Sequence, residues 1–241
     1  MPAGDFTRFR PAALTFFREL SRHNERVWFE AHRHVYDAEV LLPLRALVEE
    51  MDDRLAGLAP ELVGDPKRSI FRIHRDVRFS RDKSPYKTNA ACWFYHRDAG
   101  RGVGSSAHGG AGLYFQLGPN ACMVGGGIWM PPRDELRTLR EAIARGPRTF
   151  ERTLVAPAFR RTYGTLDKEA MLTRLPRGFA PDHPAGTWLR YQSFTASRSL
   201  SHGEVTGATL PRLLAAHFKA LIPLVRWLNS ALGYAPATRR D

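Results

Sequence analysis

Residues 102–132 contain no Asp, Glu, Lys or Arg, in a chain of 241 residues in which 25% of the residues are charged. Two apolar runs in this stretch, Leu113–Leu117 and Met123–Met130, are separated by the sequence Gly-Pro-Asn at 118–120, which favours a tight turn. Short apolar runs bounded by turn residues are typical of β-strands. The stretch therefore predicts two neighbouring strands of a central sheet.

Helical patterns flank this region on both sides. Residues 11–22 and 25–56 place apolar side chains at helical intervals, with Asn24 expected as the N-cap of the second helix and Pro43 expected to kink or divide it. The remaining expected elements are helices over 133–144, 148–156 and 210–233, strands over 70–79, 91–96 and 188–196, and a glycine-rich loop over 98–112. We expect a single α+β domain over residues 1–241, with a central, mostly antiparallel sheet and helices from the N- and C-terminal segments packed on it.

The composition excludes several classes of protein. Cys92 and Cys122 are too few for a disulfide scaffold and show no C-x-x-C spacing. The first residues contain no apolar core of a signal peptide, and no apolar run approaches the roughly 18 residues that cross a bilayer. The sequence therefore predicts a cytoplasmic protein with no membrane partner. The nine histidines lack zinc-site spacing, so no metal site is assigned. The cofactor and the oligomeric state are left open.

The net charge of +12 is concentrated in one segment. Arg supplies 31 and Lys only 5 of the 36 cations, a bias that genome composition can produce, so the pI of 10.4 alone is weak evidence for a nucleic-acid partner. Residues 67–101, however, carry 10 cations and 3 anions, a net charge of +7. More than half of the excess charge lies there, and this concentration needs a physical explanation.

The densest part of this segment is residues 72–89, RIHRDVRFSRDKSPYKTN. In a strand, Arg75 would share a face with apolar neighbours, so it is the cation expected to be buried, with Asp76 or Asp82 as its partner. The following turn combines cations with hydroxyl groups, a chemistry suited to phosphate or carboxylate. We assign candidate catalytic roles to Asp76, Arg78 and Lys83, and candidate ligand-binding roles to Arg72, Arg75, Arg81, Tyr86 and Lys87.

Three further candidates lie outside this cluster. The triple glycine at 125–127 lacks the spacing of a nucleotide loop, but Gly126 and Gly127 would let the backbone approach a ligand closely. Arg198, between two serines, is a possible addition to an anion site. For each of them the alternative is a purely structural role in the sheet.

Three functions are consistent with these features. The leading hypothesis is a pocket for a phosphorylated or carboxylated small molecule, in an enzyme or a binding protein. The first alternative is nucleic-acid binding by the basic 67–101 segment, with Trp93 or Tyr95 stacking on bases. The second is a structural or interaction module in which an internal ion-pair network neutralises the cations.

The string FRIHRDVRFSRDKSPYKTN resembles the signature of family number 2461 of the domains of unknown function. FFREL followed by HNERVWFEAHR, GLYFQL followed by GGGIWMPP, and PDHP followed by LRYQSF are similar to other parts of the same family. The resemblance extends nearly end to end and implies a widely distributed intracellular domain without an assigned activity. Gln192 stands where the family pattern has Lys, so a site lysine of the family is absent here.

Overall fold

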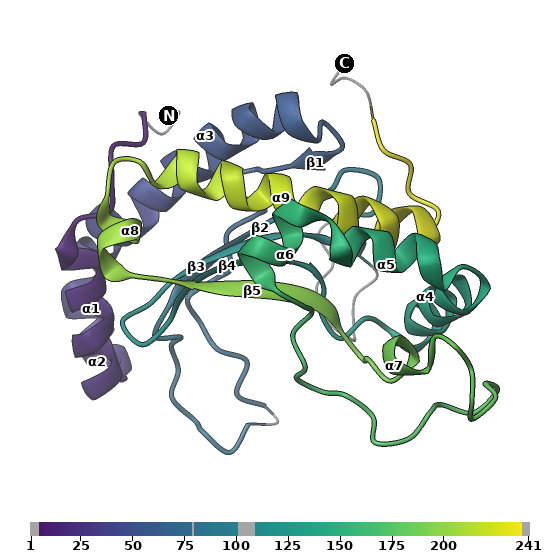
Figure 1. Cartoon of the computed structure of the whole chain (residues 1–241). Coiled ribbons are helices and arrows are strands. Elements are labelled where there is room, and N and C mark those ends of the chain that lie inside the picture. The colour runs from purple at the N-terminus through teal and green to yellow at the C-terminus, as the bar shows by residue number, and fades with distance from the viewer. Residues whose placement is uncertain (1–4, 79, 101–108, 238–241) are drawn as a thin grey trace.

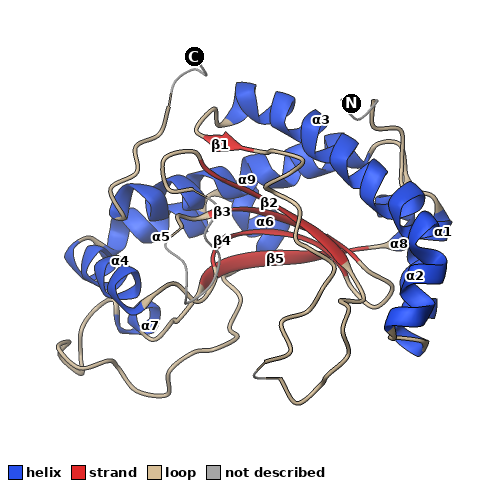
Figure 2. Ribbon diagram, turned by 180° about the vertical axis from the view of Figure 1, so that it is seen from behind, coloured by secondary structure: helices blue, strands red, loops and turns tan. Residues whose placement is uncertain are grey.

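A five-stranded antiparallel sheet forms the centre of the protein, in a computed structural model that describes residues 5–78, 80–100 and 109–237. The strands are β1 (Leu62–Val63), β2 (Ala90–His96), β3 (Gly112–Leu117), β4 (Cys122–Ile128) and β5 (Phe194–Leu200). They lie side by side in the order of the chain, so the sheet is a meander (Figure 2). The predicted α+β class is confirmed, as are the strands expected around 91–96, 113–117 and 123–130.

Helices from both ends of the chain surround the sheet, and the two longest pack on one of its faces. The first group is α1 (Pro11–Arg22), α2 (Arg26–Val35), the π-helical η1 (Tyr36–Leu41) and α3 (Leu42–Leu58). The second group is α4 (Arg133–Arg145), α5 (Pro147–Val155), α6 (Pro157–Tyr163), α7 (Gly186–Leu189), α8 (His202–Thr206) and α9 (Leu210–Ala231). Figure 1 shows α3 and α9 above the sheet and two long loops hanging below it. Within the described part of the chain, no helix combines the length and apolar character that crossing a membrane requires.

The alternation of side chains along β4 separates the two faces. Val124 and Ile128 are buried in the hydrophobic core, and a Cβ atom built on Gly126 would lie 3.2 Å from the side chain of Leu221 in α9. Gly126 therefore faces the helices. Its neighbour Gly125 must face the opposite side, towards the two long loops.

The strand register shows which residues of the neighbouring strands share the face of Gly125. Trp93 of β2 pairs with Tyr114 of β3, Tyr114 pairs with Gly125, and Gly125 pairs with Ser197 of β5. Directly paired residues project from the same side of an antiparallel sheet. These four residues thus form one row on the face that α9 leaves uncovered.

The expected strand over 70–79 is wrong. The described residues of this range, 70–78, form only isolated bridges, from Ile70 to Cys92 and from His74 to Tyr86. Residues 70–78 and 80–89 belong to an irregular projecting arm (Figure 1). Pro85 accounts for part of this, because it has no N–H to donate to a ladder and only its carbonyl is used, by the Arg75 N–H at 2.9 Å. The inferred alternation of side chains holds in part: Ile73 is buried and the even-numbered residues from 72 to 78 are exposed, but Arg75, the cation expected to be buried, is only half-buried.

Two other expectations need correction. The N-cap of α2 is Glu25, whereas the Asn24 side chain donates to the Tyr86 carbonyl and accepts from the Tyr86 N–H, both at 3.0 Å. Asn24 is thus recruited by the arm rather than by its own helix. The strand expected over 188–196 is wrong at its start, because Trp188 lies in α7 and β5 begins at Phe194. Residues 101–108 of the expected loop lie outside the described residues.

Other local signals are confirmed. Pro43 divides the long amino-terminal helical region, since it occupies the first turn of α3 directly after η1. A proline at this position removes an N–H that an unbroken helix would use. Gly233 follows the end of α9 with a φ of 89°, the left-handed conformation that ends helices.

We predict that Asn24→Ala destabilises the protein by about 1–3 kcal/mol, because the partly buried N–H and C=O groups of Tyr86 lose their partners. Urea denaturation measures the loss, and limited trypsin digestion should show faster cleavage in the arm. Asn120→Ala, in the exposed turn between β3 and β4, is the matched control and should stay within about 0.5 kcal/mol of the wild type. Equal losses of stability in the two variants would show that the hydrogen bonds between Asn24 and Tyr86 do not stabilise the arm.

Candidate functional site

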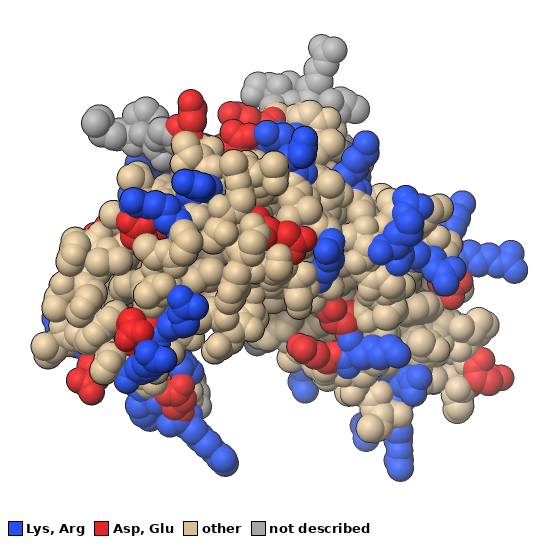
Figure 3. All heavy atoms as spheres, turned by 60° about the vertical axis from the view of Figure 1, so that its left-hand side comes forward, with Lys and Arg blue, Asp and Glu red and all other residues tan. Residues whose placement is uncertain are grey.

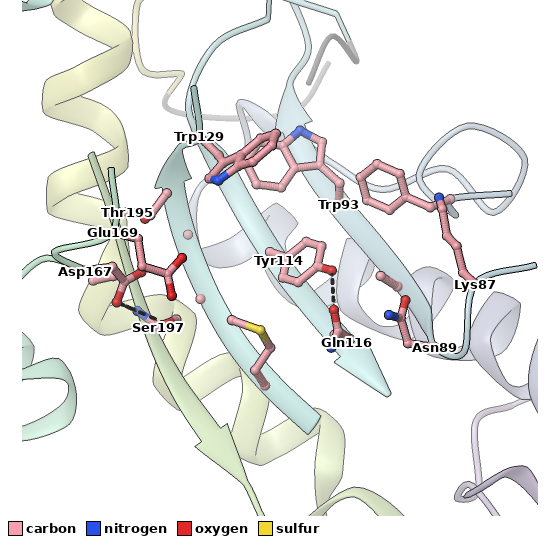
Figure 4. A pocket seen from close by; sticks show the side chains of 16 residues that line it. Lys87, Asn89, Trp93, Tyr114, Gln116, Trp129, Asp167, Glu169, Thr195 and Ser197 are labelled. Carbon is pink, nitrogen blue, oxygen red and sulfur yellow. Dashed lines mark hydrogen bonds between the residues drawn. The ribbon is translucent and has the colours of Figure 1, made fainter. Parts of the chain in front are cut away.

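A cavity of about 510 Å³ lies on the face of the sheet opposite α9. Residues of β2, β3, β4 and β5 form its floor, the arm supplies one wall, and the segment around residues 167–169 supplies the other. We call it the sheet cavity (Figure 4). Its volume matches that of small-molecule sites in proteins.

The floor of the sheet cavity is shaped by one missing side chain. Gly125 is in the middle of the row between Tyr114 and Ser197, and a Cβ atom there would lie 2.9 Å from the Ala196 carbonyl oxygen. Tyr114 lies beside this gap and donates its hydroxyl to Gln116 Oε1 at 2.8 Å. Burial raises the pKa of Tyr114 to about 12, so this hydroxyl stays a neutral donor. The floor combines an aromatic ring, a bare backbone and an amide.

The arm-side wall carries two hydrogen-bond donors that lack partners among the described residues. The Lys87 ammonium lies 5.4 Å from the centre of the Phe71 ring, and it makes neither a hydrogen bond nor an ion pair with the described part of the chain. Burial, and secondarily the charge of Arg72, lower the pKa of Lys87. Trp93 is only 8% exposed, and its indole Nε1 is buried with no acceptor. This side of the cavity therefore offers unused donors.

The opposite wall carries acceptors. Asp167 is fixed by its backbone N–H, which bonds the Thr195 carbonyl at 2.8 Å beside β5. Its Oδ1 accepts from the backbone N–H and the hydroxyl of Ser197, at 3.2 and 3.1 Å. Glu169, two residues further along, also lines the cavity, and Figure 4 shows its carboxylate beside that of Asp167. The two walls thus have opposite hydrogen-bonding character and opposite charge.

A second cavity of about 300 Å³ adjoins the first and shares Trp129, Glu169 and Thr195 with it. Trp129 is 56% exposed, which is unusual for so large an apolar side chain. Two lining residues of this second cavity, Met130 and Ala170, have φ values of 43° and 55°. Non-glycine residues adopt this conformation at a cost, and such residues cluster at binding sites.

Neighbouring groups hold both strained residues in place. The Met130 N–H donates to Ser193 Oγ at 2.9 Å, and the Gln192 amide donates to the Ala170 carbonyl at 3.0 Å. Gln192 therefore supports the wall of the second cavity.

Acidic residues of the arm pair with two of its cations, Arg75 and Arg78. Arg78 and Asp76 form an ion pair at 2.6 Å, and Arg75 pairs with Asp82, one of its two expected partners. Hydrogen bonds from Arg78 lower the pKa of Asp76 to about 2. The pKa of Asp82 also falls to about 2, through hydrogen bonds from Ser84 and then from Arg75.

The other cations of the arm have different surroundings. Lys83 Nζ donates to the Val77 carbonyl at 3.0 Å. Arg81 is exposed on the arm, and Arg72 is exposed close enough to Lys87 to influence its pKa. Tyr86 is buried and stacks on Phe29 with ring centres 4.2 Å apart, so it anchors the arm to α2. Of the cluster assigned from sequence, Lys87 is the residue that lines the sheet cavity.

The candidates outside the arm divide between the two faces of the sheet. Gly126 reaches the sheet cavity with its backbone, and Gly127 follows it with a φ of 122°. Arg198 lies on the helix-covered face, where its guanidinium donates to His217 Nε2 at 3.1 Å and reaches Glu204 at 3.4 Å. The period of two in β5 thus separates Arg198 from the serines on either side of it.

Several cavity residues were not found by sequence reasoning. Asp167 and Glu169 lie in a segment without a recognisable element, and only their spacing of two indicates that they share a side of an extended chain. Tyr114 and Gln116 share the same period-two signal within a strand that was predicted, but their partners on other strands depend on register. A single sequence does not reveal that register.

Metal and thiol chemistry receive no support from the described part of the chain. No three His, Cys, Asp or Glu side chains come together there as a ligand set. Cys92 and Cys122 are both buried, and burial raises the pKa of each thiol. Both cysteines pack in strands, as expected from their apolar surroundings.

We predict that Lys87→Met stabilises the free protein. A pKa lowered by folding means that the charged ammonium is less favourable in the folded than in the unfolded chain, so its removal should raise the melting temperature. A gain of about 1 kcal/mol corresponds to roughly 2–4 °C in a chain of this size. Thermal unfolding at pH 7 measures it. The exposed Lys168→Met is the control, and a lower melting temperature for Lys87→Met alone would contradict the prediction.

The chain belongs to the family described as "Conserved hypothetical protein (DUF2461)", whose model matches residues 12–227. The match covers most of the chain, including the sheet, the arm and both walls of the sheet cavity. No curated protein and no solved structure matches the chain.

Proposed function

We propose that this family member binds a small organic anion in the sheet cavity. The phosphate or carboxylate of the ligand lies at the Lys87 wall, and its hydroxyl or amino groups donate to Asp167 and Glu169. The proposal keeps the anionic ligand inferred from the sequence, but it moves the centre of the site from the arm to the cavity beside it.

The single observation that carries the proposal is the unpartnered ammonium of Lys87. A cation removed from water without a counter-ion costs stability, and the two carboxylates of the cavity lie on the opposite wall. An anionic group of a ligand would supply the missing partner through a charge-assisted hydrogen bond. The buried Nε1 of Trp93 offers a second donor on the same side.

The arm is the alternative position for an anion. Arg72 extends the positive end of the cavity, because its charge already acts on Lys87. Arg75 and Arg78, by contrast, are paired with aspartates of the same arm. An anion bound there would compete with those aspartates, whereas an anion at Lys87 displaces no protein carboxylate.

We favour a small ligand over a nucleic-acid chain as the partner. Tyr95 is 4% exposed and lies under Arg68, with 6.0 Å between the guanidinium carbon and the ring centre, so it offers no open face to a base. On the face shown in Figure 3, basic side chains are interspersed with acidic ones. A continuous basic track along the surface is what a phosphate backbone requires.

Two matched sets of compounds test the proposal by isothermal titration calorimetry. The first is tryptophan, tryptamine and indole-3-propionate; the second is glucosamine 6-phosphate, glucosamine and inorganic phosphate. Each set compares a molecule carrying both kinds of group with molecules that lack one of them. We expect the complete molecule to bind best in at least one set, and Lys87→Gln to weaken that binding roughly 10-fold or more.

Lys83→Gln is the matched control, because Lys83 bonds a carbonyl of the arm and lies outside the sheet cavity. It should leave the affinity unchanged. A loss of binding in Lys83→Gln, with Lys87→Gln unaffected, would place the anion site on the arm. Equal affinities for the complete and truncated compounds would overturn the proposal that one ligand uses both Lys87 and the two carboxylates.

A further inference from the structure

The tryptophans of the chain differ in their aromatic surroundings. Trp28 contacts the rings of Phe16, His23 and His32, Trp188 contacts Phe150 and Tyr191, and Trp227 contacts Phe150. Trp93 and Trp129 make no ring contact with the described residues, and both line the sheet cavity. Of the five tryptophans, the two that line the cavity are therefore the ones whose rings are available to contact a ligand.

The positions of these rings divide the cavity into two ends. Trp93 shares the donor side with Lys87, whereas Trp129 and Glu169 both line the second cavity as well as the first. Trp129 therefore belongs to the acceptor end. Three inter-strand spacings of about 4.8 Å place the backbones of β2 and β5 roughly 14 Å apart, so a ligand that uses both ends is elongated.

The order of chemical groups across the cavity is therefore anion, uncharged middle, flat ring and hydrogen-bond donors. The middle of the ligand would lie over Tyr114 and the bare backbone of Gly125. The ring would lie against the exposed indole of Trp129, and its outer edge would face Asp167 and Glu169.

We propose that the ligand is a nucleoside monophosphate, with its phosphate at Lys87, its base against Trp129 and the amino edge of the base at the two carboxylates. A nucleoside monophosphate carries these groups in this order, with the ribose as the middle. Flat bases stack on tryptophan, and carboxylates accept hydrogen bonds from the amino groups of bases. The inference rests on the proposed function, because it assigns a ligand class to the same cavity.

Guanine is the base that suits the acceptor wall best, because its ring N–H and its amino group are adjacent donors for one carboxylate. Glu169 has no hydrogen-bond or ion-pair partner among the described residues, so its carboxylate is available to take both. Hypoxanthine differs from guanine by the absence of the amino group alone. Comparing guanine with hypoxanthine therefore measures the contribution of the contact between the amino group and Glu169.

Calorimetric titration with guanosine 5′-monophosphate, inosine 5′-monophosphate, guanosine and ribose 5-phosphate tests the proposal. We expect the guanine nucleotide to bind at least 10-fold more tightly than each of the others. Glu169→Gln should reduce the preference for guanine over hypoxanthine to near unity. Binding of ribose 5-phosphate as tight as that of the nucleotide would overturn the assignment of a base, while leaving the anion site of the proposed function intact.

Substitution of Trp129 provides an independent test of the proposal. Trp129→Ala should weaken nucleotide binding at least 10-fold, and Trp129→Phe should restore most of it, because phenylalanine keeps a stacking surface. Val155, which is 57% exposed on α5, is a matched surface position, and Val155→Ala should bind like the wild type. Wild-type affinity in Trp129→Ala would overturn the stacking contact.

A last comparison separates a free nucleotide from the end of a nucleic-acid strand. A single-stranded oligonucleotide that ends in guanosine 5′-phosphate is titrated beside the mononucleotide over a range of salt concentrations. Equal affinities indicate the free nucleotide, and tighter, strongly salt-dependent binding of the oligonucleotide indicates a strand end. If no nucleotide binds but a compound from the two matched sets does, the nucleotide proposal fails alone. If nothing binds, both proposals fail.

Discussion

The three consecutive glycines of β4 are the constraint on which both faces of the sheet depend. At position 126 the missing side chain lets Leu221 of α9 approach the strand, and at position 125 it leaves the floor of the sheet cavity open. At position 127 a Cβ atom would lie 2.0 Å from the Phe194 carbonyl oxygen, so only glycine fits against β5 there. One short run of residues therefore closes the core on one side and opens the site on the other.

A second constraint is the cost of keeping charge at the cavity. The fold buries part of Lys87 beside Arg72 and supplies it with no carboxylate among the described residues. The strained backbone at Met130 and Ala170 lies beyond the opposite wall. Both features lower stability in the free protein, and they border two adjoining cavities: Lys87 lines the sheet cavity, whereas Met130 and Ala170 line the second one. Binding sites are where folded proteins tolerate such costs, because a ligand recovers part of them.

Local patterns in the sequence were enough to predict the longer helices and the three central strands, whereas the short helices α6, α7 and α8 were not predicted. The period of 3.6 in residues 11–22 and the turn at 118–120 depend on neighbouring residues alone, and both match the structure. The arm could not be predicted in this way, because its alternating pattern resembles a strand while Pro85 and the Asn24 side chain set its backbone. The hydrogen bonds between Asn24 and Tyr86 join residues 62 positions apart, and local propensity carries no information about such a contact.

The same distinction applies to the candidate site. Sequence reasoning placed the site where the cations are dense, and Lys87 at the edge of that cluster does line the sheet cavity. Two of the dense cations, Arg75 and Arg78, are however paired with aspartates of the same arm. The opposite wall, with Asp167 and Glu169, becomes visible only when the order of the strands brings β5 across from the arm.

A charge cluster in a sequence is therefore an ambiguous signal, because proximity along the chain also supplies the counter-ions. A local carboxylate neutralises its neighbour at little entropic cost, and the pair is then a feature of the fold. The cation available to a ligand is one that lines a cavity and has no carboxylate partner among the described residues. In this chain that residue is Lys87, and under the proposed function Asp167 and Glu169, on the opposite wall of the cavity, would bind the other end of the same molecule.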